Sequence, residues 1–237
     1  MKFIKPINSF TRRCYAKLKP KQLEGIGYIS GESTVHFASA DAARAYAKSR
    51  ILQALNSKEP YERAVILRDK TAYGLFEGHE RSVGGDLFHS MIKKLGCGLE
   101  VWHGHLDILP LSVSDYKVLI TSPNVESVIA YNTQNKYSKF SRIEQKQYPI
   151  FNKLLSERRM QKQLESARTH IGLCIGGHTG SKIRTNNKLL EETKDPVFKL
   201  QIQELIEKQM NELANRLNVV WQMYAKNLGI KYEHNYK

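Results

Sequence analysis

The segment Val101–Asp115 constrains the fold of this chain more than any other part of its 237 residues. It begins as an apolar stretch in which one residue separates His103 from His105, and it continues through a polar loop to Ser112 and Asp115. Side chains two residues apart in an extended strand leave the same face, so we expect both imidazoles on one side of a sheet. The serine then predicts the N-cap of a helix whose first turn carries Asp115.

Two imidazole nitrogens and one carboxylate oxygen form a set of three ligands for a metal ion. Zinc held by three protein ligands keeps a fourth position for water, which is the composition of catalytic rather than structural zinc sites. A hydrolytic site of this kind also needs a base for the water and a donor for the oxyanion that forms on a carbonyl. Ser112, at the predicted N-cap, can turn its hydroxyl towards such a site.

The predicted base is a carboxylate on a neighbouring strand, close to the water but not itself a ligand. Glu62 stands at the start of an apolar strand and is our first choice, and Glu77 and Glu100 remain as alternatives. The sequence also allows an interpretation without metal, in which the histidines line one strand face and Ser112 and Asp115 only cap a helix. In a third interpretation, the domain has lost its metal and is retained for binding.

Residues 60–142 show a compact alternation of strand and helix patterns in the order β-β-α-β-α-β-β. The expected fold class is α/β (α+β), with a mixed sheet flanked by helices. We divide the chain into a basic N-terminal segment (residues 1–58), a metal-binding domain (residues 59–142) and a helical C-terminal region (residues 143–237). Within the central domain we expect strands over residues 63–67, 71–76, 99–105, 125–131 and 136–140, and helices over residues 84–95 and from residue 112.

Both flanks of the central domain carry patterns of their own. In the N-terminal segment, two short strands within residues 23–38 precede a helix that begins at Ser39 or Asp41 and ends near Leu55. The whole N-terminal segment, including its basic residues, is expected to form an extension of the central domain.

The C-terminal region has the apolar periodicity of helices. Residues 144–169 are polar and helix-prone, and a long helix is expected from Pro196 to Leu228, ended by Gly229. Between these helices, the glycines of residues 172–180 predict a loop. The regular apolar steps of the last helix predict a helical hairpin that packs on the chain's own domain or, alternatively, forms a homodimer.

Two weaker candidate sites lie near those glycines. Cys174 and His178 could contribute to a second metal site, although no further ligand pair is close to them in the sequence. The stretch Gly177–Arg184 combines glycines, hydroxyls and bases that could hold a phosphate, but it does not match a P-loop. A flexible basic loop is the better interpretation of this stretch.

The composition limits the class of partner. The chain has 37 Lys and Arg against 23 Asp and Glu, a net charge of +14, and residues 1–22 hold seven basic residues and no acid. Such an excess attracts polyanions, nucleic acid among them, or only keeps a surface solvated. The sequence has no apolar run long enough to span a bilayer and no secretory signal, so we expect no membrane association. Three scattered cysteines fit a reducing cytoplasm.

The spacing of the central segment resembles that of a known family. His103-Gly-His105, followed by Ser112 and Asp115, is similar to the His-x-His…Ser-x-x-Asp signature of the JAMM (MPN/JAB) metalloproteases. The order of elements is also similar, because a glutamate, Glu62, opens the first strand and a hairpin and a helix precede the histidine strand. The resemblance implies a cytidine-deaminase-like, MPN-type sheet.

One further feature makes the resemblance more specific, and another departs from the family pattern. The run Pro110-Leu111-Ser112 is similar to one found in bacterial and phage RadC-like members, whereas Leu106 replaces the proline that usually follows the second histidine. The resemblance covers about residues 60–142, and the flanks on either side of it resemble no family that we can name.

The resemblance implies a role for each candidate residue. His103, His105 and Asp115 would hold zinc, Glu62 would act as the general base, and Ser112 would assist at the oxyanion. The implied activity is hydrolysis of a peptide or isopeptide bond in a protein or peptide substrate, with a ubiquitin-like tail as one candidate. An alternative hypothesis, motivated by the positive charge, is a nucleic-acid-associated binding protein on a RadC-like scaffold, with or without metal. A secreted effector is a third hypothesis that the sequence does not test.

Overall fold

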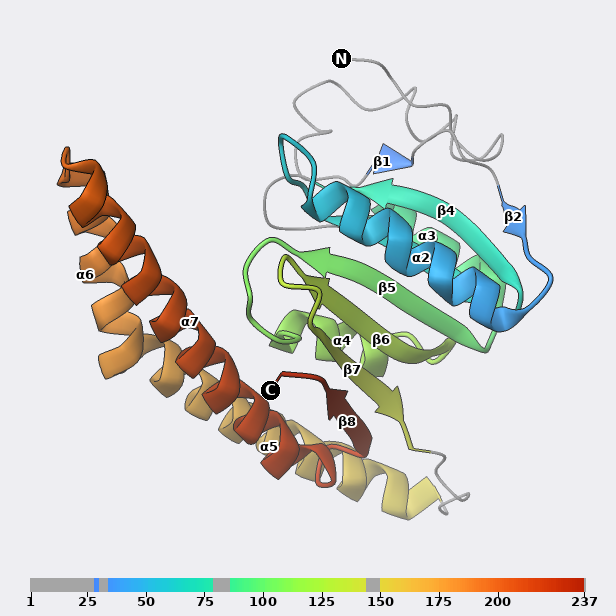
Figure 1. Cartoon of the computed structure of the whole chain (residues 1–237). Coiled ribbons are helices and arrows are strands. Elements are labelled where there is room, and N and C mark those ends of the chain that lie inside the picture. The colour runs from blue at the N-terminus through green and yellow to red at the C-terminus, as the bar shows by residue number, and fades with distance from the viewer. Residues whose placement is uncertain (1–27, 30–33, 79–85, 144–149, 237) are drawn as a thin grey trace. The chain divides into compact units, whose positions relative to one another are not determined.

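The computed structural model describes residues 28–29, 34–78, 86–143 and 150–236 (Figure 1). The chain divides into two compact units. Unit 1 consists of Met1–Asp107 and Leu111–Ser141, and unit 2 consists of Ile108–Pro110 and Arg142–Lys237. The basic residues 1–22 lie outside the described residues.

Unit 1 has the mixed α/β architecture that the sequence predicted. Its strands follow the order β1-β4-β3-β5-β6-β7, and β2 also pairs with β4. Neighbouring strands are antiparallel except for β5 and β6, which are parallel. The elements are β1 (Tyr28–Ile29), β2 (Val35–His36), α2 (Ala40–Leu55), β3 (Arg63–Arg68), β4 (Thr71–Glu77), α3 (Asp86–Leu95), β5 (Leu99–His105), α4 (Val113–Thr121), β6 (Val125–Asn132) and β7 (Tyr137–Arg142).

Helices cover both faces of this sheet, with α2 in front of it and α3 and α4 behind it in Figure 1. The side chains of α2 share one core with residues of β3, β5 and β6. Each large apolar side chain buried there contributes roughly 1.5–3 kcal/mol relative to an exposed one. This core contains Ala43, Ala47, Ile51 and Leu55 from α2, and Val65, Leu67, Trp102, Ile129 and Tyr131 from the sheet.

The opposite face of the sheet packs through aromatic contacts. Phe76 of β4 meets Phe88 of α3 edge to face, with ring centroids 5.4 Å apart. Tyr116 of α4 meets Phe140 of β7 in the same way at 6.1 Å. Such pairs add about 0.5–1.5 kcal/mol to the burial of their area. The face opposite α2 is therefore the side on which α4, the helix that carries Asp115, is held.

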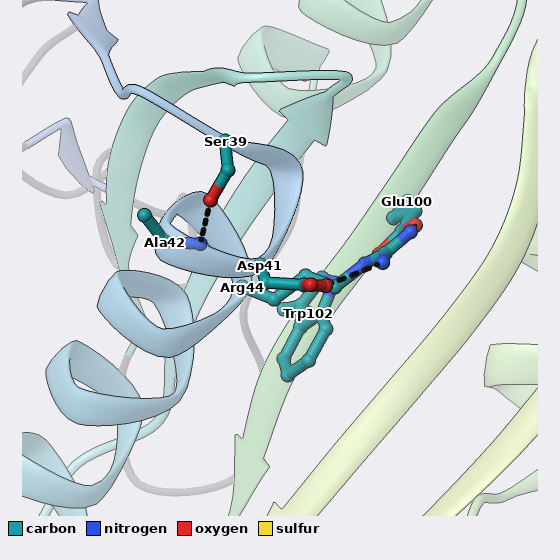
Figure 2. A network of polar contacts seen from close by, with 6 residues as sticks. All are labelled: Ser39, Asp41, Ala42, Arg44, Glu100 and Trp102. Atoms are coloured by element: carbon teal, nitrogen blue, oxygen red, sulfur yellow. Dashed lines mark hydrogen bonds and ion pairs between the residues drawn. The ribbon is translucent and has the colours of Figure 1, made fainter.

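The local signals of the sequence predicted the elements of unit 1 closely. The helix α2 begins after Ser39, whose hydroxyl accepts a hydrogen bond from the Ala42 amide at 3.1 Å (Figure 2). Asp69, with a φ of 51°, turns the chain between β3 and β4, and Gly96, with a φ of 75°, follows α3. The strand β5 has the bounds predicted for it. The two short strands expected within residues 23–38 are found as β1 and β2, each paired with β4.

Unit 2 consists of α5 (Ile150–Gly176), α6 (His178–Glu192), α7 (Pro196–Ala225) and β8 (Ile230–His234). The loop predicted over residues 172–180 is wrong, because α5 runs to Gly176 and α6 begins at His178. The long helix starts at Pro196 as predicted, but it ends at Ala225 instead of continuing to Leu228. Among the described residues, none of the helices combines the length and apolar character needed to cross a membrane.

Candidate metal centre

The strand β5 carries both candidate histidine ligands near its C-terminal end. His103 is paired with Ala64 of β3 on one side and with Ala130 of β6 on the other. Because Trp102, between Val101 and His103, packs in the core under α2, His103 and His105 leave the opposite face of the sheet. His103 is 5% exposed, so its ring lies within the protein.

The side chain of Asp115, from the first turn of α4, meets both imidazoles. Its Oδ1 lies 3.1 Å from His103 Nε2, and its Oδ2 lies 3.5 Å from His105 Nε2. The two Nε2 atoms are 3.0 Å apart. One ligand atom from each residue thus lies within 4.8 Å of the others, and the three form a group that could hold a metal ion.

The orientation of Asp115 is fixed by the N-terminus of its own helix. Its Oδ2 accepts hydrogen bonds from the Ser112 amide at 2.6 Å and from the Ser112 hydroxyl at 2.7 Å. The Ser112 hydroxyl in turn accepts one from the Asp115 amide at 3.3 Å, which completes a capping box. Because both bonds from Ser112 end on Oδ2, Oδ1 remains directed towards His103. The capping and metal-binding interpretations are therefore compatible, since one carboxylate satisfies both.

The electrostatics of the group favour a charged carboxylate. Burial alone would raise the pKa of Asp115, but the charge of His103 and hydrogen bonds from His103 and His105 hold the pKa well below its ordinary value. An ionised carboxylate beside two imidazoles is the state in which these residues bind a metal cation.

The dimensions of the group suit a small tetrahedral ion. Zinc binds histidine nitrogen and carboxylate oxygen at about 2.0–2.2 Å, which places neighbouring tetrahedral ligands roughly 3.3 Å apart. The Nε2 atoms of the two histidines, 3.0 Å apart, and His103 Nε2 with Asp115 Oδ1, 3.1 Å apart, are close to this separation. Asp115 approaches His105 Nε2 through its other oxygen, Oδ2, at 3.5 Å. Three protein ligands also leave a coordination position for water. The donor set therefore fits zinc, and other divalent ions that accept nitrogen and oxygen share the fit.

Glu62 immediately precedes β3, and its side chain is 9% exposed. If the antiparallel register of Ala64 and His103 is continued by two residues, Glu62 lies across from His105. Burial raises the pKa of Glu62 to about 7, with the charge of His105 opposing and those of Asp115 and Asp107 reinforcing the increase. The Glu62 carboxylate is thus electrostatically coupled to the metal-binding group, with a pKa suited to proton transfer near neutral pH.

The other two candidate bases form ion pairs with arginine side chains. Glu77 forms an ion pair with Arg63, with 2.6 Å between Oε1 and the guanidinium. Glu100 lies on the α2 side of β5, where Arg44 binds it at 2.6 Å and the Trp102 indole donates to it at 2.9 Å (Figure 2). By contrast with these two ion-paired carboxylates, Glu62 has a pKa that reflects the charges of His105 and Asp115.

The sequence analysis did not single out one carboxylate near this group. Asp107 is exposed and follows His105 by two residues, and its charge contributes to the raised pKa of Glu62. Its position just past the end of the histidine strand was a signal that we did not use.

The weaker candidate near the glycines gains no support. Among the described residues, His103, His105 and Asp115 are the one group of three or more potential ligands with converging atoms. Cys174 packs beside an apolar cluster of α6 and α7 that includes Ile183 and Leu213. The stretch Gly177–Arg184, considered as a phosphate loop, lies mostly within α6.

No protein-family model, curated protein or solved structure matches this chain. The case for a metal centre therefore depends on the chemistry and geometry of its own side chains.

Proposed function

We propose that this protein is a zinc-dependent hydrolase that cleaves peptide or isopeptide bonds. The observation that carries the proposal is the convergence of His103, His105 and Asp115, with the buried Glu62 carboxylate beside them. Three ligands, an open coordination position and an adjacent base with a pKa near neutrality are the parts that metal-assisted hydrolysis requires. The resemblance of this segment to the JAMM signature supports the same reaction class.

In this proposal each residue has a defined role. The two imidazoles of His103 and His105 and the carboxylate of Asp115 would hold the ion. When bound, zinc would supply Lewis acidity, lowering the pKa of the attacking water and polarising the scissile carbonyl. Glu62 accepts the proton of that water and later delivers it to the leaving amine. The pKa of this carboxyl is about 7 in the metal-free chain, and bound zinc would favour the ionised form, which is the form that accepts a proton.

Ser112 has a role that differs from the one implied by the resemblance. Its hydroxyl has a single hydrogen, and in this structure that hydrogen is donated to Asp115 Oδ2. Ser112 therefore acts by holding the ligand carboxylate in place. Assistance at the oxyanion requires the hydroxyl to turn away from Asp115. The Ser112→Ala variant separates the two roles, because loss of ligand positioning weakens zinc binding, whereas loss of an oxyanion donor lowers kcat at unchanged zinc affinity.

The proposed substrate is a protein or peptide with an amide bond accessible to the centre. A ubiquitin-like tail is one such substrate. The competing proposal is a nucleic-acid-associated binding protein, which is favoured by the net charge of +14 rather than by the site.

Zinc analysis and hydrolysis assays on the purified chain test the proposal directly. We expect one zinc per chain, loss of zinc in His103→Ala, and hydrolysis of peptide or isopeptide substrates that a chelator abolishes and zinc restores. In Glu62→Gln we expect retained zinc and at least a 100-fold lower kcat, since a positioned base contributes about 10²–10⁴-fold.

The matched control is Glu77→Gln, which changes the same residue type on the next strand, away from the metal ligands. It should retain both zinc and activity. A chain that binds no zinc, or an activity equally sensitive to Glu77→Gln and Glu62→Gln, would refute the assignment. Salt-sensitive nucleic-acid binding by a metal-free chain without hydrolysis would favour the competing proposal.

A further inference from the structure

The back of the histidine strand is in unusually close contact with α2. Gly104 lies between the two histidines and faces that helix. A Cβ atom built on it would lie 3.0 Å from Leu55 Cδ2 and 3.2 Å from Ile51 Cγ2. Both side chains are buried in the core, so a Cβ atom at position 104 would require them, or the strand, to shift by a few tenths of an ångström. Gly104 has no positive φ, and the glycine is therefore required for space rather than for backbone conformation.

This contact lies where β5 has fewer strand neighbours. The described ladder between β3 and β5 ends at the Ala64–His103 pair. The ladder between β5 and β6 continues through Gly104, paired with Tyr131, and His105, paired with Asn132. Among the described strand pairings, His103 is thus held from both sides and His105 from one side only. The packing of α2 against Gly104 supports this end of the strand from its face.

The other end of the contact between α2 and β5 is fixed by polar groups. Figure 2 shows the Arg44 side chain of α2 reaching Glu100 of β5. The Arg44 Nε bonds both carboxylate oxygens of Glu100 at 3.1 and 3.2 Å, and a second nitrogen bonds Oε1 at 2.6 Å. The Trp102 indole completes the network by donating to Oε2 at 2.9 Å. The residues of β5 that face α2 are therefore anchored at Glu100 and tightly packed at Gly104.

We propose that Gly104 is a positioning residue for the metal centre: by admitting Leu55 and Ile51 against the strand, it sets the place of His105 relative to His103. This inference depends on the metal site of the proposed function, and it gives α2 a part in building that site. A side chain at position 104 would push the end of β5 away from α2. His105 would move with it, whereas His103, held by two strands, would stay.

The test is a double-mutant cycle read out by zinc affinity. We expect Gly104→Ala to weaken zinc binding by about 10- to 100-fold, the range seen when supporting residues around a metal are changed. Leu55→Ala removes Leu55 Cδ2 and Cγ, two of the three closest atoms, so the double variant should bind zinc more tightly than Gly104→Ala alone. Absorption spectra of Co²⁺ bound in place of zinc should show an altered coordination in the single variant and a recovered one in the double variant.

Glu100→Gln provides a second route if Gly104→Ala does not fold. It loosens the polar anchor of α2 without adding bulk, and it should lower zinc affinity severalfold. Asp41→Asn is its matched control, because it removes only the exposed Asp41–Arg44 pair and should leave zinc affinity unchanged.

Each outcome of these measurements bears on the inference. Unchanged zinc affinity and Co²⁺ spectrum in Gly104→Ala would overturn it, as would a loss that Leu55→Ala does not relieve. For an unfolded Gly104→Ala, unchanged affinity in Glu100→Gln would overturn it. A wild-type chain that binds neither ion would overturn the proposed function and this inference with it, whereas zinc binding in the wild type separates the two.

Discussion

At the scale of single residues, the most informative group is the Glu62 carboxyl. Burial raises its pKa from an ordinary value of 4.5 to about 7 in the folded chain. Below pH 4.5 the group is protonated in the folded and the unfolded state and has no effect on stability. As pH rises from 4.5 towards 7, the carboxyl loses its proton in the unfolded state before it does so in the folded state. The free energy of unfolding therefore falls over this range.

The Glu62→Gln variant should reveal this loss in the metal-free protein. At pH 8 we expect the variant to have a higher free energy of unfolding than the wild type, by an amount on the order of 3 kcal/mol at most. At pH 4 the two should be equal. Denaturant titrations in the presence of a chelator measure the difference, and added zinc should reduce it because a nearby cation favours the ionised carboxylate. A constant difference between pH 4 and pH 8 would contradict the raised pKa.

The same residue shows why the sequence ranked Glu62 first as the candidate base but left Glu77 and Glu100 open. Glu62, Glu77 and Glu100 are all close to predicted strands, and alternation alone does not distinguish them. What distinguishes them is long-range pairing: Arg63 binds Glu77, and Arg44 of α2 binds Glu100 from 56 positions away in the sequence. The convergence of His103, His105 and Asp115 was easier to predict, because strand alternation and a helix cap are local rules.

At the scale of elements, the structure differs most clearly from the prediction at the junction of α5 and α6, where one residue, Gly177, separates the two helices. A Cβ atom on Gly180 would lie 1.7 Å from the Ile175 carbonyl oxygen, and one on Gly177 would lie 2.5 Å from that of Leu173. These glycines allow two helices to meet with almost no connection. The glycines predicted a loop because the sequence alone does not distinguish glycines that permit close backbone contact from glycines that make a segment flexible.

The two glycine environments give a matched pair of variants. Gly180→Ala has to displace the α5 backbone, and we expect it to destabilise unit 2 by more than about 2 kcal/mol. Gly172→Ala adds a methyl group within α5 where nothing lies within 4 Å of it. It should stabilise the helix by about 0.5–1 kcal/mol, since alanine is the better helix former. Thermal unfolding followed by circular dichroism compares the two variants. Equal melting temperatures would contradict the close approach of Gly180 to the α5 backbone.

The elements of unit 1 were predicted more accurately for a physical reason. Turns such as Asp69-Lys70 and stops such as Gly96 act locally, and β3, β5 and β6 contain short apolar runs that are almost entirely buried. The strand β8 was not predicted: Ile230 and Tyr232 alternate with charged residues, but the pattern is five residues long and only Ile230 is buried. Strand formation at such a place depends on packing rather than on an intrinsic preference.

At the scale of the whole molecule, the net charge of +14 is the property that the metal centre does not explain. The ligand group and Glu62 bring together carboxylates and imidazoles that are mostly buried, so they add little to the positive field at the surface. Attraction to polyanions should therefore be independent of the metal centre. We expect the wild type and His103→Ala to bind double-stranded DNA with the same affinity, with or without a chelator.

Salt dependence identifies the charges responsible for such binding. Each phosphate neutralised by a basic residue contributes about 0.9 to the slope of log affinity against log salt concentration. Lys17, Lys19 and Lys21 lie in the acid-free residues 1–22, and changing all three to Gln should lower the slope by up to about 2.7. Binding titrations at salt concentrations between about 50 and 200 mM, over which such affinities fall by orders of magnitude, measure this slope. A slope unchanged by the triple variant would assign the binding to other basic residues, and binding lost in His103→Ala would show that the metal centre and the charged surface form one site.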